Sequence, residues 1–374
     1  MGKHAVLSAS SSERWLNCPP SVRLSEAYED RGSDYAAEGT DAHTLCEFRL
    51  KQALGIPADD PVENLSWYNE EMEECAQSYA SYVMELLGMQ KIFCSDPVVM
   101  IEQRVNFSRW VKEGFGTADC ILIADGVMNI VDYKHGKGVE VTAVENPQMM
   151  LYALGALEIF DGIYDISSVR MTVFQPRKNN VSVFKMQKDD LLRWADTELA
   201  PKAELAYEGK GDFHCGEWCR FCKAKAECRE RAETNMRLAQ YEFLAPALLD
   251  DEEIAEILGK IDALTSWASD IKEHALQQAI SGKNWTGWKL VEGRSNRKYT
   301  NEAVVATTVE GAGFDPYEHK VLGITAMQKM LGKSRFDDLL SPYIEKPQGK
   351  PTLVPESDKR PAINPAKTDF MEEF

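Results

Sequence analysis

Two aspartates and a lysine near the middle of the chain have the types and spacing that hydrolytic chemistry requires. Asp119 opens one predicted strand, and Asp132 precedes Lys134 by two positions at the end of the next. Strand alternation puts Asp132 and Lys134 on one face, and a hairpin turn at Asp125-Gly126 would bring Asp119 beside Asp132. Two carboxylates can hold a hard cation such as Mg²⁺, while the ammonium orients a water or balances phosphorane charge. These residues are the minimal set for metal-assisted phosphodiester hydrolysis, although an Asp-x-Lys triplet by itself is more often solvated surface charge.

Three more residues are candidates for the same site. Gln148 and Tyr152 lie four positions apart, which places them on one face of the predicted helix that follows the Asp132 strand. Gln148 could bind a phosphate or a base, and Tyr152 could stack or donate a hydrogen bond. His43 lies on an early predicted helix, where a neutral imidazole could be a third metal ligand.

The cysteines form a second candidate centre. The chain has nine cysteines, and four of them fall within the fourteen residues 215–228. The odd count, without a secretion signal, favours a reducing compartment and thiolate chemistry over disulfides. A zinc ion would take Cys215, Cys219, Cys222 and Cys228, whereas a [4Fe–4S] cluster would take Cys18 with Cys219, Cys222 and Cys228. The other cysteines are predicted to be buried small apolar residues: Cys46, Cys75, Cys94 and Cys120.

The elements that must position these residues are a mixture of strands and helices. Hydrophobic alternation predicts strands over 98–107, 117–124, 128–133, 169–174 and 181–186. Helical periodicity predicts helices over 36–54, 65–90, 145–160, 189–206, 250–281, 301–311 and 324–332. The serines of residues 8–18 predict a short N-capped helix that ends at Cys18-Pro19-Pro20.

The composition permits a large buried core. The chain has 374 residues, 44% of them hydrophobic, which excludes a disordered or fibrous protein. We predict three parts: a domain over 1–238 with both candidate centres, a mainly helical domain over 239–346, and a flexible tail over 347–374. No apolar run approaches the roughly 20 residues of a membrane span, so we expect a cytoplasmic protein without a membrane contact.

The net charge argues against a bulk, non-specific nucleic-acid coat. The chain carries 60 acidic and 42 basic side chains, a formal charge of −18. Residues 1–100 hold 17 of the acids and only 7 of the bases. Two later stretches are locally basic: 220–237, and the predicted hairpin near 285–299, which contains Trp285 and Trp288. Cations interleaved with aromatic rings suit single-stranded DNA, so these stretches could line a substrate channel.

The order of the motifs resembles the RecB-type branch of the PD-(D/E)xK nucleases. The matching segments are AEGTDAH (37–43), GTADCILI (116–123), IVDYKHG (130–136) and QMMLY (148–152). The resemblance implies an α/β fold: a restriction-endonuclease-like core with a mixed central sheet flanked by helices, followed by a helical C-terminal appendage. It implies His43, Asp119, Asp132 and the carbonyl of Tyr133 as ligands of Mg²⁺ or Mn²⁺, and Lys134 as the catalytic lysine. Glu102 would be an extra acid, and Asp132 stands where many relatives have Glu.

The cysteines extend the resemblance to CRISPR-associated RecB-like exonucleases and to uncharacterised phage or prophage proteins. SSSERWLNCPP (10–20) and CRFCKAKAEC (219–228) match their pattern, which favours the [4Fe–4S] set of Cys18, Cys219, Cys222 and Cys228 in a structural role. Cys215 is an extra thiol that departs from the pattern, so a zinc site stays an alternative to the iron–sulfur cluster. The implied protein is a DNA nuclease, most simply an exonuclease, of phage replication or recombination in a bacterial host. The alternatives are a non-catalytic DNA- or partner-binding nuclease fold and a zinc-ribbon interaction protein. The sequence predicts no oligomeric state.

Overall fold

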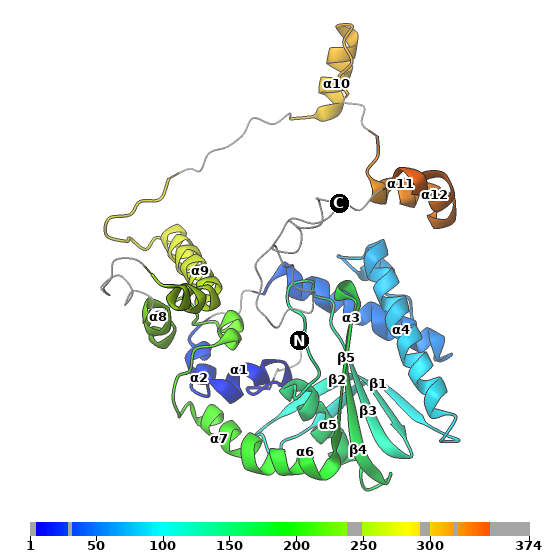
Figure 1. Ribbon diagram of the computed structural model, residues 1–374, viewed down its shortest axis with the longest axis vertical. Coiled ribbons are helices and arrows are strands. Elements are labelled where there is room, and N and C mark those ends of the chain that lie inside the picture. The colour runs from blue at the N-terminus through cyan, green and yellow to red at the C-terminus, as the bar shows by residue number, and fades with distance from the viewer. Residues whose placement is uncertain (1–4, 29–31, 238–248, 292–299, 318–320, 345–374) are drawn as a thin grey trace, which may run out of the picture. The chain divides into compact units, whose positions relative to one another are not determined.

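A mixed sheet of five strands lies between two groups of helices in the computed structural model (Figure 1). The structure describes residues 5–28, 32–237, 249–291, 300–317 and 321–344. The strands follow chain order across the sheet. They are β1 (Val98–Asn106), β2 (Phe115–Ala124), β3 (Gly126–Tyr133), β4 (Ile166–Gln175) and β5 (Asn180–Gln187). Each neighbouring pair is antiparallel except β3 with β4, which is parallel. The predicted mixed α/β fold is therefore confirmed.

One face of the sheet packs against the helix that connects the two parallel strands. This helix is α5 (Pro147–Phe160), and a parallel pair requires such a crossover. Its side chains share a core with inward residues of β2, β3 and β4 and with the flanking short helices. These helices are α1 (Ser12–Asn17), α2 (Ser21–Glu26), α6 (Lys188–Trp194) and α7 (Ala200–Glu208), and a π-helical stretch, Ala195–Leu199, joins the last two.

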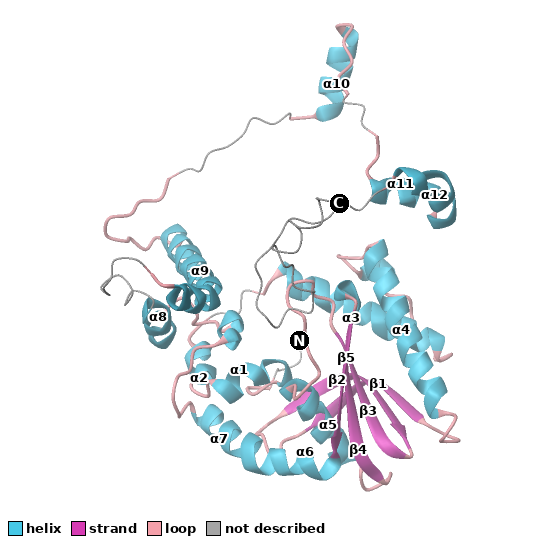
Figure 2. Ribbon diagram, viewed as in Figure 1, coloured by secondary structure: helices cyan, strands magenta, loops and turns pink. Residues whose placement is uncertain are grey.

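The other face of the sheet is covered by two long helices, α3 (Asp34–Ala53) and α4 (Glu70–Gln90) (Figure 2). They bury a second core with the opposite faces of β2 and β3. Each begins at a side-chain cap: Ser33 accepts from the N–H of Ala36, and Asn69 accepts from the N–H of Met72. The sheet is thus covered by helices from both sides, which agrees with the predicted central sheet flanked by helices.

The remaining helices follow the cysteine segment. They are α8 (Arg229–Met236), α9 (Asp251–Ile280), α10 (Glu302–Gly311), α11 (Ile324–Leu331) and α12 (Lys333–Leu340). The chain divides into two compact units, Met1–Gln277 and Gln278–Phe374, whereas the sequence placed a boundary between 238 and 239. Most of α9 belongs to the first unit because Asp270 pairs with Lys225 at 2.8 Å and with Arg231 at 2.5 Å.

Two predictions fall partly outside the described residues. The expected basic hairpin has no strand in its described portion, 285–291, which consists of a turn and loop residues, while 292–299 lie outside the described residues. The tail predicted from residue 347 also lies outside them. Among the residues that the structure describes, no helix is both long and apolar enough to traverse a lipid bilayer.

Candidate functional site

The hairpin of β2 and β3 brings the two predicted aspartates to one end of the sheet. In its antiparallel register Cys120 pairs with Val131, so Asp119 and Asp132 come next at the same end. The backbone N–H of Tyr133 donates a hydrogen bond of 2.7 Å to Asp119 Oδ2, which links the ends of the two strands directly. The predicted juxtaposition of the two carboxylates is present.

A backbone irregularity in β1 lies opposite Asp119. The β1–β2 register pairs Ile101 with Cys120 and Gln103 with Ala118, but omits Glu102, whose φ is +49°. Ala118 belongs to the core on the α5 side and Cys120 to the core on the α3 side, although a regular strand would keep them on one face. The break turns Asp119 toward α3. Left-handed backbone at a non-glycine residue costs on the order of 1–3 kcal/mol and is concentrated at functional sites.

His43 approaches Asp119 from α3. Its Nδ1 lies 3.3 Å from Asp119 Oδ1, and its ring meets the edge of Tyr133 with 5.5 Å between centroids. Single donor atoms of His43, Glu102 and Asp119 all lie within 4.8 Å of one another. Imidazole nitrogen and carboxylate oxygen are ligand types that Mn²⁺ and Mg²⁺ sites use. The extra acid Glu102 is therefore beside the two predicted ligands, from the strand where the irregularity lies.

Asp132 faces a second group of polar residues, on the α5 side. Its Oδ2 lies 2.9 Å from Lys134 Nζ, and its Oδ1 accepts a hydrogen bond of 3.2 Å from Gln148 Nε2. Gln148 also accepts from Lys134 Nζ at 3.1 Å and donates to the Tyr152 hydroxyl at 3.1 Å. Asn146 caps α5 by accepting from the N–H of Gln148 at 3.0 Å, which fixes where the helix begins. All four predicted side chains are joined in one network.

The site is buried at its base and open at its mouth. The Asp132 side chain is only 3% exposed, whereas His43 and Lys134 keep 34% and 26%. A solvent-borne ligand could therefore reach the imidazole and the ammonium while the carboxylate of Asp132 holds Lys134 from behind.

The carboxylates differ in how well the groups around them compensate their charge. Burial, followed by the charge of Asp119, raises the pKa of Glu102 to about 7. Burial also raises the pKa of Asp132, against the opposing effect of Lys134. Burial lowers and Asp119 raises the pKa of His43, which comes to about 9. Burial raises and His43 lowers the pKa of Asp119, with a net decrease, so this carboxylate stays ionised. Glu102 and Asp132 favour protons, and a divalent cation that bound beside them would displace those protons.

The cysteine centre combines segments that lie two hundred positions apart. Cys18, at the end of α1, lines one cavity together with Cys219, Cys222 and Cys228. The [4Fe–4S] ligand set suggested by the resemblance is thus gathered around a common space.

Two guanidinium groups, those of the half-buried Arg14 and the buried Arg231, also line this cavity. Arg14 Nη1 donates to the carbonyl of Ser21 at 3.0 Å, to its hydroxyl at 2.9 Å and to the Ser25 hydroxyl at 3.2 Å. Burial lowers the pKa of Arg14, while Cys222 and Cys18 raise it. Fixed positive charge beside four thiolates would stabilise an anionic metal–thiolate group.

The remaining cysteines fall into two classes. Cys215 is not among the residues that line the cavity, but a hydrogen bond from Cys219 lowers its pKa to about 7. It lies close enough to keep the alternative zinc set open. The four predicted structural cysteines are all buried and free, which confirms that prediction: Cys46, Cys75, Cys94 and Cys120.

Comparison with known proteins assigns the chain to a protein family. The sequence profile described as "Protein of unknown function (DUF2800)" matches residues 4–361. The chain belongs to this family. It also resembles a solved structure titled "Crystal structure of SSO0001", with 13% identity over 50% of this chain and 95% of the other. The TM-score is 0.22, so this likeness supports no conclusion about the DUF2800 chain.

Three residues beside the site had no role assigned from the sequence. His135 directly follows Lys134, Glu38 precedes His43 by five positions on α3, and Arg177 lies in the turn between β4 and β5. His135 and Glu38 are within the segments IVDYKHG and AEGTDAH, which is the only signal that could have indicated them. Arg177 gave no signal, because its contacts with α3 and α4 are long-range.

Proposed function

We propose that this DUF2800 protein is a Mg²⁺- or Mn²⁺-dependent DNA nuclease of the RecB-type PD-(D/E)xK class. The observation that carries the proposal is the convergence of His43, Asp119, Asp132 and Lys134 at one end of a mixed sheet. These residues come from one helix and two strands, and rigid elements hold reacting groups more accurately than loops do.

The proposed metal ligands are His43, Asp119, Asp132 and the carbonyl of Tyr133, with Glu102 as a further carboxylate. The donor set fits the cation because ligand atoms of His43, Glu102 and Asp119 lie within 4.8 Å of one another and the buried Glu102 carboxylate is crowded by Asp119. When bound, the cation would polarise a phosphoryl oxygen.

Lys134 is the proposed catalytic lysine of the site. Burial lowers and Asp132 raises the pKa of Lys134, with a net increase, so its ammonium stays protonated. A protonated Lys134 can orient the attacking water by a hydrogen bond and balance the charge that develops on the phosphate. Asp132 and Gln148 hold the ammonium at 2.9 and 3.1 Å, which limits its rotation.

Gln148 and Tyr152 are the proposed substrate contacts. Nε2 of Gln148 donates to Asp132 and to the Tyr152 hydroxyl, so a phosphate beside Lys134 would take over one of these donors. The Tyr152 hydroxyl accepts from Gln148 and keeps its own proton to donate to that phosphate. The ring of Tyr152 packs closely against Gly116, since a Cβ at that glycine would come within 2.8 Å of the ring. The close approach explains why a glycine precedes the Thr117-Ala118-Asp119 segment.

The cysteines would hold a [4Fe–4S] cluster through Cys18, Cys219, Cys222 and Cys228, with zinc and Cys215 as the alternative. We assign this group a structural role, since it would join the start of the chain to the segment that follows the nuclease core. DNA is the proposed partner, and a phage or prophage setting in the cytoplasm of a bacterial host remains part of the proposal.

The basic stretch 220–237 contributes less to DNA binding than its composition indicates. Lys225 and Arg231 both pair with Asp270, which reduces the charge that this stretch offers to a phosphate backbone. DNA binding should therefore depend chiefly on the metal-loaded site.

The test is cleavage of end-labelled single- and double-stranded DNA by the full chain with Mg²⁺ or Mn²⁺. Lys134→Ala should reduce the rate roughly 10²- to 10³-fold, the usual range for loss of one donor that stabilises transition-state charge. Lys185→Ala, which removes an exposed lysine of β5, should retain the wild-type rate. A metal-loaded wild type without cleavage, or a Lys134→Ala variant with the wild-type rate, would reject catalysis and favour a binding protein.

A further inference from the structure

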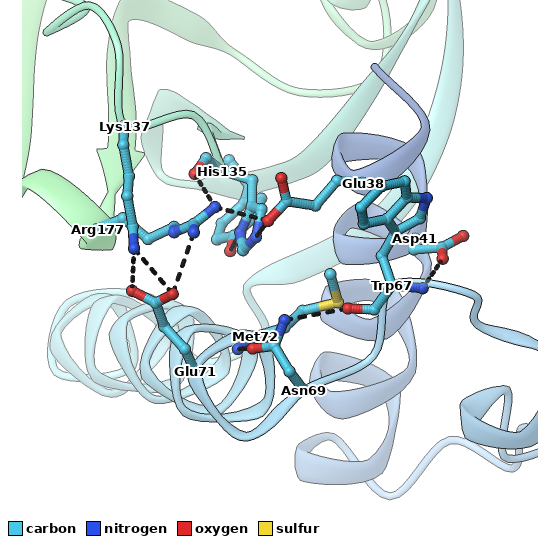
Figure 3. A network of polar contacts seen from close by, with 10 residues as sticks. Glu38, Asp41, Trp67, Asn69, Glu71, Met72, His135, Lys137 and Arg177 are labelled. Atoms are coloured by element: carbon cyan, nitrogen blue, oxygen red, sulfur yellow. Dashed lines mark hydrogen bonds and ion pairs between the residues drawn. The ribbon is translucent and has the colours of Figure 1, made fainter. Parts of the chain in front are cut away.

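A second polar network connects the mouth of the metal site to the ends of three elements. In Figure 3 the side chains of Glu38, His135 and Arg177 point toward one another. Glu38 comes from the first turns of α3, His135 from the segment after β3, and Arg177 from the turn after β4. The side chains are largely buried: Glu38 is 19% exposed, His135 4% and Arg177 12%.

Glu38 is the centre of this network. Its Oε1 accepts from Arg177 Nη1 at 2.8 Å and lies 3.3 Å from His135 Nε2. His135 Nδ1 is 2.8 Å from the hydroxyl of Tyr133. An imidazole that donates from Nε2 to Glu38 accepts at Nδ1 from the Tyr133 hydroxyl, so the contacts form one continuous chain of hydrogen bonds.

Arg177 joins the chain to a second helix. Its Nη2 contacts Glu71 Oε2 at 3.0 Å, and Lys137 contacts the same carboxylate at 2.8 Å (Figure 3). Glu71 lies in the first turn of α4. A guanidinium presents its two Nη groups in a fixed planar fork, so one Arg can hold two carboxylates of two helices at a set separation.

The consequence is that α3 holds the end of β3 at two points. Glu38 contacts His135, one residue beyond Lys134, while His43 contacts Asp119 and the ring of Tyr133. Lys134 lies between Tyr133 and His135, and Asp132 comes directly before them. The distance between the imidazole on α3 and the carboxylates on the strands therefore depends on the Glu38 contact.

We infer that Arg177 is a positioning residue, which fixes α3 through Glu38 and so sets His43 at the distance from Asp119 that metal binding requires. The inference rests on the proposed function, because it concerns the metal affinity of the same site. Residues that orient metal ligands typically change metal affinity 10- to 100-fold when they are replaced.

The molecule offers a matched control in a second Arg–Glu pair. Arg49 of α3 contacts Glu73 of α4 at 2.7 Å, and these side chains are 18% and 15% exposed, close to the values for Arg177 and Glu38. This pair also joins α3 to another element, but it makes no contact with the 133–135 segment. Loss of either arginine should cost similar stability, and only one should affect the metal.

The experiment measures Mn²⁺ binding to the full chain by the EPR signal of free Mn²⁺, with Asp119→Asn as the background for sites elsewhere. Arg177→Met should weaken the site roughly 10- to 100-fold. Arg49→Met should bind Mn²⁺ as the wild type does, with a comparable decrease in melting temperature. Arg177→Lys should give an intermediate affinity, since an ammonium cannot hold both carboxylates in the same geometry.

The direction of the change in Mn²⁺ affinity distinguishes a positioning role of Arg177 from a purely electrostatic one. Removing a positive charge near a cation site should strengthen cation binding, so a weaker site in Arg177→Met points to geometry. Cleavage should show a raised Mn²⁺ requirement with most of the rate recovered at saturating Mn²⁺. Equal or tighter Mn²⁺ binding in Arg177→Met, or an equal loss in Arg49→Met, would overturn the inference. A wild type that binds no Mn²⁺ beyond the Asp119→Asn background would overturn the proposed function and this inference together.

Discussion

The two candidate metal centres of this protein are built in opposite ways. The site at the sheet end takes its ligand groups from α3, β1, β2 and β3, and nearly every polar side chain there already contacts another. The cysteine centre takes one thiol from the end of α1 and three from a segment of turns and short helix after the core. The first arrangement would position the reacting groups of the proposed nuclease, whereas the second would join distant parts of the chain. The difference teaches that one centre should control activity and the other stability.

The substitution Asp119→Asn should have the largest effect, and it tests whether the two centres are separate. Asp119 is shared by His43, Tyr133 and the proposed cation, so its loss should reduce metal-dependent cleavage by roughly 10²-fold or more. The metal content of the cysteine centre should not change. Cleavage rates and elemental analysis of the same preparation measure both, and Asp161→Asn, at the far end of α5, is the control.

Cys18→Ser should have the converse effect. Loss of the one thiol from the start of the chain would open the linkage between Cys18 and Cys219, and we expect a stability loss of about 3 kcal/mol, as for a long covalent loop. Below its melting temperature the variant should still bind Mn²⁺. Urea denaturation measures the difference.

The control for this prediction is Cys94→Ser, which alters a buried cysteine outside the cavity and should cost about 1 kcal/mol. A Cys18→Ser variant as stable as the wild type would mean that the thiols hold no group that links the chain.

The substitution Glu73→Gln should have the smallest effect. It tests whether the contact between α3 and α4 at Arg49 and Glu73 contributes to stability alone, without affecting either centre. Burial raises and Arg49 lowers the pKa of Glu73, and the net change is a decrease from 4.5. A depressed pKa in the folded state stabilises the fold above the unfolded value and loses that contribution as the pH falls through the folded value. The variant should lose about 1 kcal/mol or less near neutral pH, because an amide of the same shape still accepts a hydrogen bond from Arg49.

Urea denaturation above and below pH 4.5 should therefore show a smaller pH dependence for Glu73→Gln than for the wild type, with Mn²⁺ binding unchanged. A steeper pH dependence in the variant, or a change in Mn²⁺ affinity, would contradict the assignment of this pair to stability alone.

The strands and helices could be predicted well, because alternation, turn residues and helix caps are all set by neighbouring residues in the sequence. The alternation in β2 and β3 and the turn at Asp125-Gly126 were sufficient to place Asp119 beside Asp132. Predicted helix bounds differ from those of α5 and α9 by at most a few residues. The cap at Asn146 and the proline after it mark the start of α5 in the sequence itself.

Other features depend on contacts that no local pattern encodes. The left-handed backbone of Glu102 arises opposite Asp119 in a neighbouring strand, and nothing in the sequence around Glu102 requires it. Arg177 meets Glu38 across 139 positions of the chain. The association of α9 with the first unit depends on Asp270, an ordinary surface residue by sequence. The meeting of Cys18 with the later cysteines could be expected only from the family resemblance.

The most direct test of the central claim is the position of Mn²⁺ in crystals of the full chain, located by its anomalous scattering. The account predicts a peak at the sheet end, within ligand distance of His43 and the carboxylates of Asp119 and Asp132. The Arg177→Met variant should show the same peak at lower occupancy. A chain saturated with Mn²⁺ whose anomalous peaks all lie away from His43 and Asp119 would contradict the account.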